Sequence, residues 1–158
     1  MNQLNRREFV TAVACAACLC GLGGAAKALA DDTTPSTAPS SLDAGPKSDY
    51  SHDGITTTWI KPPYLIAVVR HDGKIFALTT VCTHRGGHLR EADDHVSFVC
   101  PRHGATFDID GNVTGRPAKK PLTRYGISVD SNGHVIVDMT TSFTSDQWDD
   151  PASFVKAD

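Results

Sequence analysis

Cysteine is scarce outside the N-terminus of this chain, and clustered positive charge is scarcer still. Three of the five cysteines, Cys15, Cys18 and Cys20, lie in an apolar N-terminal stretch, so the other two can form at most one disulfide. Beyond residue 30 the only adjacent basic residues are Lys119 and Lys120, which argues against a nucleic-acid-binding surface. No internal repeat and no convincing helical stretch is visible, so we expect neither a repeat protein nor a helical bundle.

The remaining composition is that of one globular domain. Apolar residues make up 40% of the chain and charged residues 21%, which argues against wholesale disorder and against several membrane spans. The 158 residues leave room for one compact domain of about 110 residues once the N-terminal stretch is set aside. Residues 31–158 carry 12 Lys and Arg against 17 Asp and Glu. This net negative charge favours a protein partner with a basic docking surface.

The N-terminal stretch has the three parts of an export signal. Arg6 and Arg7 precede an apolar run over residues 9–26, and Ala28-Leu29-Ala30 supplies a cleavage site. The paired arginines followed by Phe9 resemble a twin-arginine signal, a class read by a receptor for folded proteins. We therefore predict a twin-arginine-type signal peptide over residues 1–30. An uncleaved membrane anchor is the alternative, because the apolar run is just long enough to span a bilayer.

Three further segments follow this leader. Residues 31–48 are rich in Ser, Thr and Pro at their start and are predicted to be a polar linker. Residues 49–139 are predicted to form the folded domain. Residues 140–158 form an acidic C-terminal tail, in which Trp148 and Phe154 either anchor the tail on the domain or serve a docking role.

Short β-rich runs separated by turns fill the predicted domain. Residues 64–70 and 74–78 flank an Asp72-Gly73 turn, which is a hairpin signal. Further runs at 95–99, 106–109, 124–129 and 134–137 are punctuated by Gly and Asn in the same way. The pattern predicts an all-β fold, an antiparallel β-sandwich or barrel.

The two cysteines of the domain each stand beside a histidine, immediately after a predicted strand. Cys82-x-His84 follows the hairpin, and Cys100-x-x-His103 follows the strand that ends at Val99. Two loops at one end of a β scaffold, each offering a thiolate and an imidazole, predict a four-ligand metal site. A Cys82–Cys100 disulfide and a structural zinc site are the alternatives. The other histidines are expected at the surface: His52, His71, His88, His95 and His134.

The sequence around these residues resembles the Rieske [2Fe–2S] family over about residues 55–137. Residues 81–87 and 100–108 resemble its two cluster-binding boxes, and residues 115–122 resemble its proline loop. The resemblance implies one [2Fe–2S] cluster in a loop subdomain, with Cys82 and Cys100 on one iron and His84 and His103 on the other. It also implies an electron-transfer protein or a redox subunit of an oxidoreductase, and no stand-alone enzyme, because the chain is too short for the catalytic domain of a Rieske oxygenase.

Departures from the family pattern bear on the kind of Rieske protein. Gly87 and Arg102 occupy the positions at which Rieske subunits of cytochrome bc complexes usually carry a disulfide, and Ala105 replaces a Ser that donates to a bridging sulfide. These changes predict a potential at the low end of the Rieske range. The leader points instead to export, to the periplasm or the periplasmic face of the cytoplasmic membrane. We therefore expect an exported carrier or redox subunit that serves a redox protein or a membrane cytochrome complex. The alternatives are the quinol-oxidising subunit of a cytochrome bc-type complex and the small subunit of a periplasmic oxidoreductase.

Overall fold

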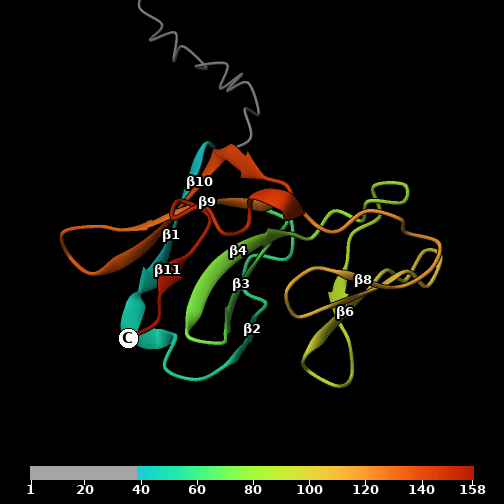
Figure 1. Cartoon of the computed structure of the whole chain (residues 1–158), viewed down its shortest axis with the longest axis horizontal. Coiled ribbons are helices and arrows are strands. Elements are labelled where there is room, and N and C mark those ends of the chain that lie inside the picture. Colours follow the sequence, from blue (N-terminus) through green and yellow to red (C-terminus); the bar gives the residue numbers. More distant parts are fainter. Residues whose placement is uncertain (1–38) are drawn as a thin grey trace, which may run out of the picture. The chain divides into compact units, whose positions relative to one another are not determined.

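The computed structural model of the chain describes residues 39–158, and almost all of its elements are β-strands (Figure 1). Two short 3-10 helices, η1 and η2, accompany them. In chain order the elements are β1 (Ser41–Pro46), η1 (Lys47–Asp49), β2 (Gly54–Thr56), β3 (Ile66–His71), β4 (Lys74–Thr79), β5 (Arg90–Glu91), β6 (Ser97–Val99), β7 (Thr106–Asp108), β8 (Val113–Gly115), β9 (Arg124–Val129), β10 (His134–Phe143), η2 (Ser145–Gln147) and β11 (Val155–Lys156). The predicted signal peptide lies outside the described residues.

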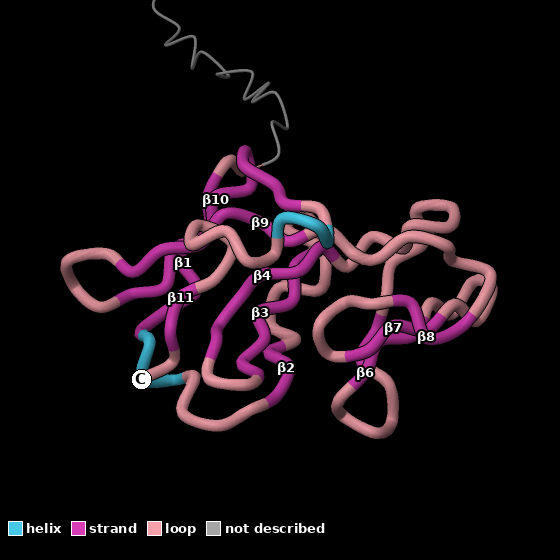
Figure 2. The backbone as a smooth tube through the Cα atoms, viewed as in Figure 1, coloured by secondary structure: helices cyan, strands magenta, loops and turns pink. Residues whose placement is uncertain are grey.

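The strands form two antiparallel sheets. The large sheet has seven strands in the order β1-β10-β9-β4-β3-β2, with β11 added along β4. The small sheet has four strands in the order β5-β6-β7-β8, and Figure 2 shows β6, β7 and β8 beside the large sheet. This arrangement confirms the predicted all-β antiparallel fold with a separate loop-bearing subdomain. No helix within residues 39–158 is long and apolar enough to cross a bilayer.

The β3–β4 hairpin contributes to both apolar clusters of the described residues. Its turn places Asp72 at φ 49° and Gly73 at φ 71°, the left-handed pair that matches the twist of a tight hairpin. The hairpin is buried on both faces: Ile66 and Val68 pack into the core of the large sheet, while Ala67 and Val69 face the opposite way. Burial on both faces explains why β3 reads as a continuous apolar run.

The second face of the hairpin packs against the small sheet. Phe76 and Leu78 of β4 pack in one apolar cluster with Phe98 of β6 and Phe107 of β7. All four side chains are at most 1% exposed. Burial of such large side chains is the main term that holds the small sheet to the large one.

The predicted linker over residues 31–48 is wrong at its C-terminal end. Residues 41–46 form β1, which pairs with β10 from Ser41 opposite Asp138 to Pro46 opposite His134. Leu42 and Ala44 alternate with exposed neighbours and are 5% and 4% exposed. Two apolar residues in a polar tract give only a weak periodic signal for a strand. Pairing with β10 is what makes this segment a strand.

The C-terminal residues 140–158 pack on the domain, so the first of the two predicted roles for this segment is the one observed. Strand β10 continues through Phe143, and β11 pairs with β4 at Val155 opposite Ile75. Phe154 packs against the cluster shared by the two sheets. The boundary predicted at residue 139 therefore falls inside a strand.

Candidate metal centre

The four predicted ligands lie in two loops that follow β4 and β6. The first loop, residues 80–89, connects β4 to β5 and is closed by a bridge between Val81 and His88. The second loop, residues 100–105, connects β6 to β7. Because β4 and the small sheet share one apolar cluster that includes Cys82 and Cys100, the two loops meet.

The backbone folds around the two cysteines in the same way. The Cys82 carbonyl accepts from the Gly86 N–H at 2.9 Å, and the Cys100 carbonyl accepts from the Gly104 N–H at 2.9 Å. In return the Cys82 N–H donates to the Gly87 carbonyl at 2.7 Å, and the Cys100 N–H donates to the Ala105 carbonyl at 2.8 Å. The turns need Gly86 and Gly104 at φ 65° and 72°, where other residues are strained. Each loop thus holds its cysteine in the same hydrogen-bonded turn, which we call a knuckle.

The two thiols are free and buried. Cys82 and Cys100 are each 2% exposed and form no disulfide, so the predicted disulfide alternative is not observed. Burial raises the pKa of the Cys82 thiol, and the neighbouring Cys100 raises it further, while backbone N–H groups of His84 and Arg85 act in the opposite direction. Coordination to a metal would stabilise the thiolate against this effect of burial, since a coordinated thiol is deprotonated.

The two imidazoles also lie together. The rings of His84 and His103 are edge to face, with centroids 5.0 Å apart and planes at 86°. His103 is exposed and His84 is half-buried. Burial lowers the pKa of His84, and so do the neighbouring His103 and Arg85. This direction favours the neutral imidazole, which is the form that binds metal.

Gly87 and Arg102 meet across the two loops. A Cβ added to Gly87 would lie 3.1 Å from Cδ of Arg102 and 2.9 Å from Sγ of Cys100. These two positions correspond to a disulfide pair in the pattern of cytochrome bc Rieske subunits, and their proximity agrees with that correspondence. Neither residue has a thiol, so no disulfide can join the two loops here. The aliphatic part of Arg102 packs over Gly87 instead.

A third loop, residues 116–123 between β8 and β9, completes the site. The Thr83 hydroxyl donates to the Lys120 carbonyl at 2.7 Å and ties this loop to the first one. A pocket of about 430 Å³ lies between them, lined by Thr83, His84, Pro117, Lys119 and Lys120. The sequence gives no signal for this hydrogen bond, because every residue has a backbone carbonyl that can accept one, whatever its side chain.

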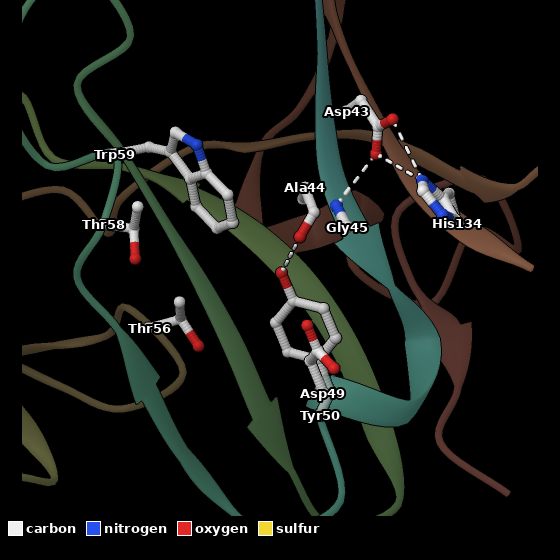
Figure 3. Close-up of a pocket in the computed structure, with 9 residues that line it drawn as sticks. All are labelled: Asp43, Ala44, Gly45, Asp49, Tyr50, Thr56, Thr58, Trp59 and His134. Atoms are coloured by element: carbon white, nitrogen blue, oxygen red, sulfur yellow. Dashed lines mark hydrogen bonds and ion pairs between the residues drawn. The ribbon is translucent and has the colours of Figure 1, made fainter.

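Histidines outside the two loops mostly make surface contacts, as predicted. His71 lies within 4 Å of Asp53 and Asp110, and His95 contacts Glu91 at 2.9 Å. Another pocket, of about 480 Å³, lies on the large sheet (Figure 3). Its polar groups contact one another: His134 contacts Asp43, and the Tyr50 hydroxyl donates to the Ala44 carbonyl. It contains neither cysteine nor loop histidine, and we assign it a structural role.

The donor set fits a binuclear iron–sulfur cluster. Two neighbouring thiols and two neighbouring imidazoles offer one pair of like ligands to each of two irons, which is the Rieske arrangement. Within residues 39–158 no three His, Cys, Asp or Glu side chains gather as ligands of a single metal ion. In a two-iron cluster of this kind, each iron takes only two ligands from the protein.

Comparison with known families settles the class of protein. Residues 40–126 match the Rieske [2Fe-2S] domain, so the chain belongs to the Rieske [2Fe-2S] domain family. Membership of this family implies one [2Fe-2S] cluster.

Relatives carry the names of iron-sulfur subunits of cytochrome complexes. The chain is 35% identical over 74 residues to the cytochrome b6-f complex iron-sulfur subunit of Chlorobaculum tepidum, which covers 46% of this chain and 39% of that protein. It is 30% identical over 122 residues to the subunit of the same name from Synechococcus sp. (strain CC9605), covering 77% and 66%. The chain thus spans well under half of the first of these relatives.

Solved structures give similar matches. The plasma membrane Rieske protein of Synechocystis PCC 6803 is 29% identical with a TM-score of 0.45, covering 61% of this chain and 98% of that one. A ferredoxin of Sphingomonas yanoikuyae B1 is 25% identical with a TM-score of 0.45, covering 62% and 97%.

Proposed function

We propose that this protein transfers single electrons through a Rieske [2Fe–2S] cluster held by Cys82, Cys100, His84 and His103. The observation that carries the proposal is the pairing of like donors on two knuckles with the same hydrogen-bond pattern. Two buried thiols form the inner pair and two imidazoles the outer pair. No residue is assigned a catalytic role.

When bound, the cluster supplies a one-electron couple whose potential depends on its ligands and on hydrogen bonds to its sulfurs. The chain's own groups set that environment. The backbone N–H groups of His84 and Arg85 face the Cys82 sulfur and stabilise negative charge there. His103 is exposed, so a partner that docks over it comes next to one of the proposed cluster ligands.

The reduction potential should lie at the low end of the Rieske range. Ala105 is fully buried beside Cys100 and has no hydroxyl to donate to a sulfide, and Arg102 lies where a cross-loop disulfide would be. Fewer hydrogen bonds to the sulfurs leave the reduced state less stabilised. We expect a midpoint below about +200 mV, within the Rieske range of about −150 to +300 mV.

A membrane cytochrome complex or an exported redox protein is the proposed partner. The relatives named as cytochrome b6-f iron-sulfur subunits favour the first, and the leader over residues 1–30 favours a place outside the cytoplasm, as a cleaved signal or as a retained anchor. Quinol oxidation is the second candidate function. A potential that stays flat with pH near neutrality supports a simple carrier, and one that falls with pH supports quinol chemistry at His84 or His103.

Cluster content tests the proposal directly. We expect the purified protein to hold two irons and two acid-labile sulfides per chain, the composition of the cluster, and its reduced form to give an EPR signal averaging below the free-electron g value. His84→Ala should abolish that signal. His88→Ala is the matched control, because His88 is exposed in the same loop and lies outside the proposed ligand set. A zinc-loaded protein without labile sulfide would overturn the proposal.

A further inference from the structure

Positive charge in this domain is concentrated in the loops of the metal centre, and the rest of the domain is net negative. The three loops that form the metal centre, residues 80–89, 100–105 and 116–123, contain five basic residues and no Asp or Glu: Arg85, Arg102, Arg116, Lys119 and Lys120. The remainder of residues 39–158 carries seven Lys and Arg against fifteen Asp and Glu. A net negative domain therefore presents a positive face at its proposed redox centre, which we call the cluster face.

The five cations of the cluster face are available to a partner. All five are exposed, and within the described part of the chain none takes part in an ion pair. By contrast, Arg70, Lys74, Arg90 and Arg124 of the remainder each lie within 4 Å of a carboxylate. Charges left unpaired on one face dominate the field that an approaching molecule meets.

Four of these cations lie beside the two histidines of the proposed ligand set. Lys119 and Lys120 line the same pocket as His84. Arg85 is the residue after His84, and Arg102 is the residue before His103. The hydrogen bond from Thr83 to Lys120 fixes the third loop beside the first.

We propose that the redox partner docks on the cluster face through an acidic protein surface. This inference rests on the proposed function and reverses the expectation of a basic partner, which the net charge alone suggested. Exposed large apolar side chains would favour a permanent interface or membrane insertion. Within residues 39–158 these are Val96 and Val129, and neither belongs to the three loops. A small polar face with unpaired charge suits a transient electron-transfer complex.

An acidic protein surface fits this face better than an anionic lipid surface. An electron leaving near His84 and His103 needs an acceptor group within the docked molecule, and lipid headgroups contain none. Carboxylates on a protein can neutralise the five cations and bring such a group close. Electrostatic attraction of this kind raises association rates by roughly 10-fold to 1,000-fold at low salt.

Small redox probes of opposite charge test the sign of the face without the natural partner. The reduced holoprotein loses one electron to ferricyanide, a trivalent anion, or to tris(phenanthroline)cobalt(III), a trivalent cation. We expect added salt to slow the reaction with ferricyanide and to accelerate the reaction with the cobalt complex, because screening weakens both local interactions. The net charge would give the opposite pair of salt effects.

Charge-reversal variants locate the effect. Lys119→Glu with Lys120→Glu should lower the ferricyanide rate constant at low salt roughly tenfold. Lys47→Glu in η1 with Lys156→Glu in β11 changes the net charge equally outside the three loops and should leave that rate within about twofold. Equal effects of the two pairs, or wild-type salt effects of the opposite sign, would overturn the proposal.

Binding to anionic polymers and lipids separates the two kinds of surface. Poly-L-glutamate at low salt should bind the holoprotein, and the Lys119/Lys120 variant should bind it roughly tenfold more weakly. Tighter binding to phosphatidylglycerol vesicles than to poly-L-glutamate, lost in the same variant, would overturn the proposal in favour of a membrane surface. Cluster content is measured separately by EPR, so a protein with a normal cluster and no binding refutes the docking face and leaves the proposed function intact.

Discussion

The large sheet and the small sheet are stabilised in different ways. The large sheet has strands of up to ten residues and its own apolar cluster, in which Ile66, Val68, Ile75, Val135 and Val137 are fully buried. The small sheet has strands of two or three residues, and its core is shared with the β3–β4 hairpin and with the two cysteines. The large sheet has an apolar core of its own, whereas the small sheet shares its core with the hairpin, and we expect the small sheet to depend further on the group that its loops hold.

Cluster removal should produce the largest difference between the two sheets. In a Cys82→Ser, Cys100→Ser double variant we expect amide exchange to accelerate on the order of a hundredfold in β6 and β7, while β4 and β9 keep their protection. Short strands cannot persist once the loops between them lose their ligand. Hydrogen exchange with mass spectrometry checks this against the holoprotein. A uniform loss of protection in both sheets would show that they fold as one unit.

A pair of glycine variants separates steric fit from backbone strain in the loops. Gly87→Ala brings a methyl group to 2.9 Å from Sγ of Cys100, so we expect a loss of about 1–3 kcal/mol and a lower iron content. Gly104→Ala meets nothing within 4 Å but sits at φ 72°, so we expect about 1–2 kcal/mol with a normal iron content. Chemical denaturation and iron analysis measure both effects. Equal iron contents in the two variants would contradict the close approach at Gly87.

The hairpin and the proximity of the four proposed ligands were predictable because each has a strong signal in the sequence. Asp72-Gly73 between two apolar runs predicts β3 and β4, and the observed bounds differ from the predicted ones by at most two residues. The spacing of Cys82, His84, Cys100 and His103 brought together residues that the structure also brings together. Turn chemistry and ligand spacing are local properties, which a sequence shows directly.

The elements missed from the sequence depend on distant partners. Strand β1 has only Leu42 and Ala44 as apolar signals, and β11 has two residues. Their identity as strands comes from pairing with β10 and β4. The charge of the cluster face is also nonlocal, because its five cations come from three loops and net charge hides their clustering.

The C-terminal segment belongs with the large sheet, and Trp148 tests that assignment. Arg124, which is 4% exposed, lies between two rings: its guanidinium carbon is 3.7 Å from the centroid of Phe76 and 4.4 Å from that of Trp148. Burial lowers the pKa of Arg124 to about 10, so the side chain stays charged at neutral pH and needs these contacts.

We expect Trp148→Ala to lower the free energy of unfolding by about 1–2 kcal/mol, because a desolvated cation–π contact is lost. Trp148→Phe is the conservative control and should retain most of that stability. The EPR spectrum should not change in either variant. Thermal melting together with EPR makes the measurement, and a change of the cluster signal in Trp148→Ala would tie the segment to the small sheet.

The smallest expected effect is the pH dependence of the contact between β1 and β10. His134 contacts Asp43 at 3.0 Å, and this hydrogen bond is the main cause of a raised His134 pKa; Asp130 and Asp49 act in the same direction. The pKa of Asp43 is lowered, first by the Gly45 N–H and then by His134. A raised histidine pKa contributes stability below its ordinary value of 6.5, and this is lost as pH rises through the folded value. A lowered carboxyl pKa contributes stability above its ordinary value of 3.8, and this is lost as pH falls through the folded value.

Both contributions are therefore present together between pH 3.8 and 6.5. We expect His134→Gln to lower the melting temperature most in this window and least above it, with His52→Gln, another exposed histidine, as the control. Both partners are exposed, so the effect should be small and should fade in 1 M salt, where screening acts over about 3 Å. A difference that stayed constant up to high pH would assign the role of His134 to the packing of its side chain rather than to its charge.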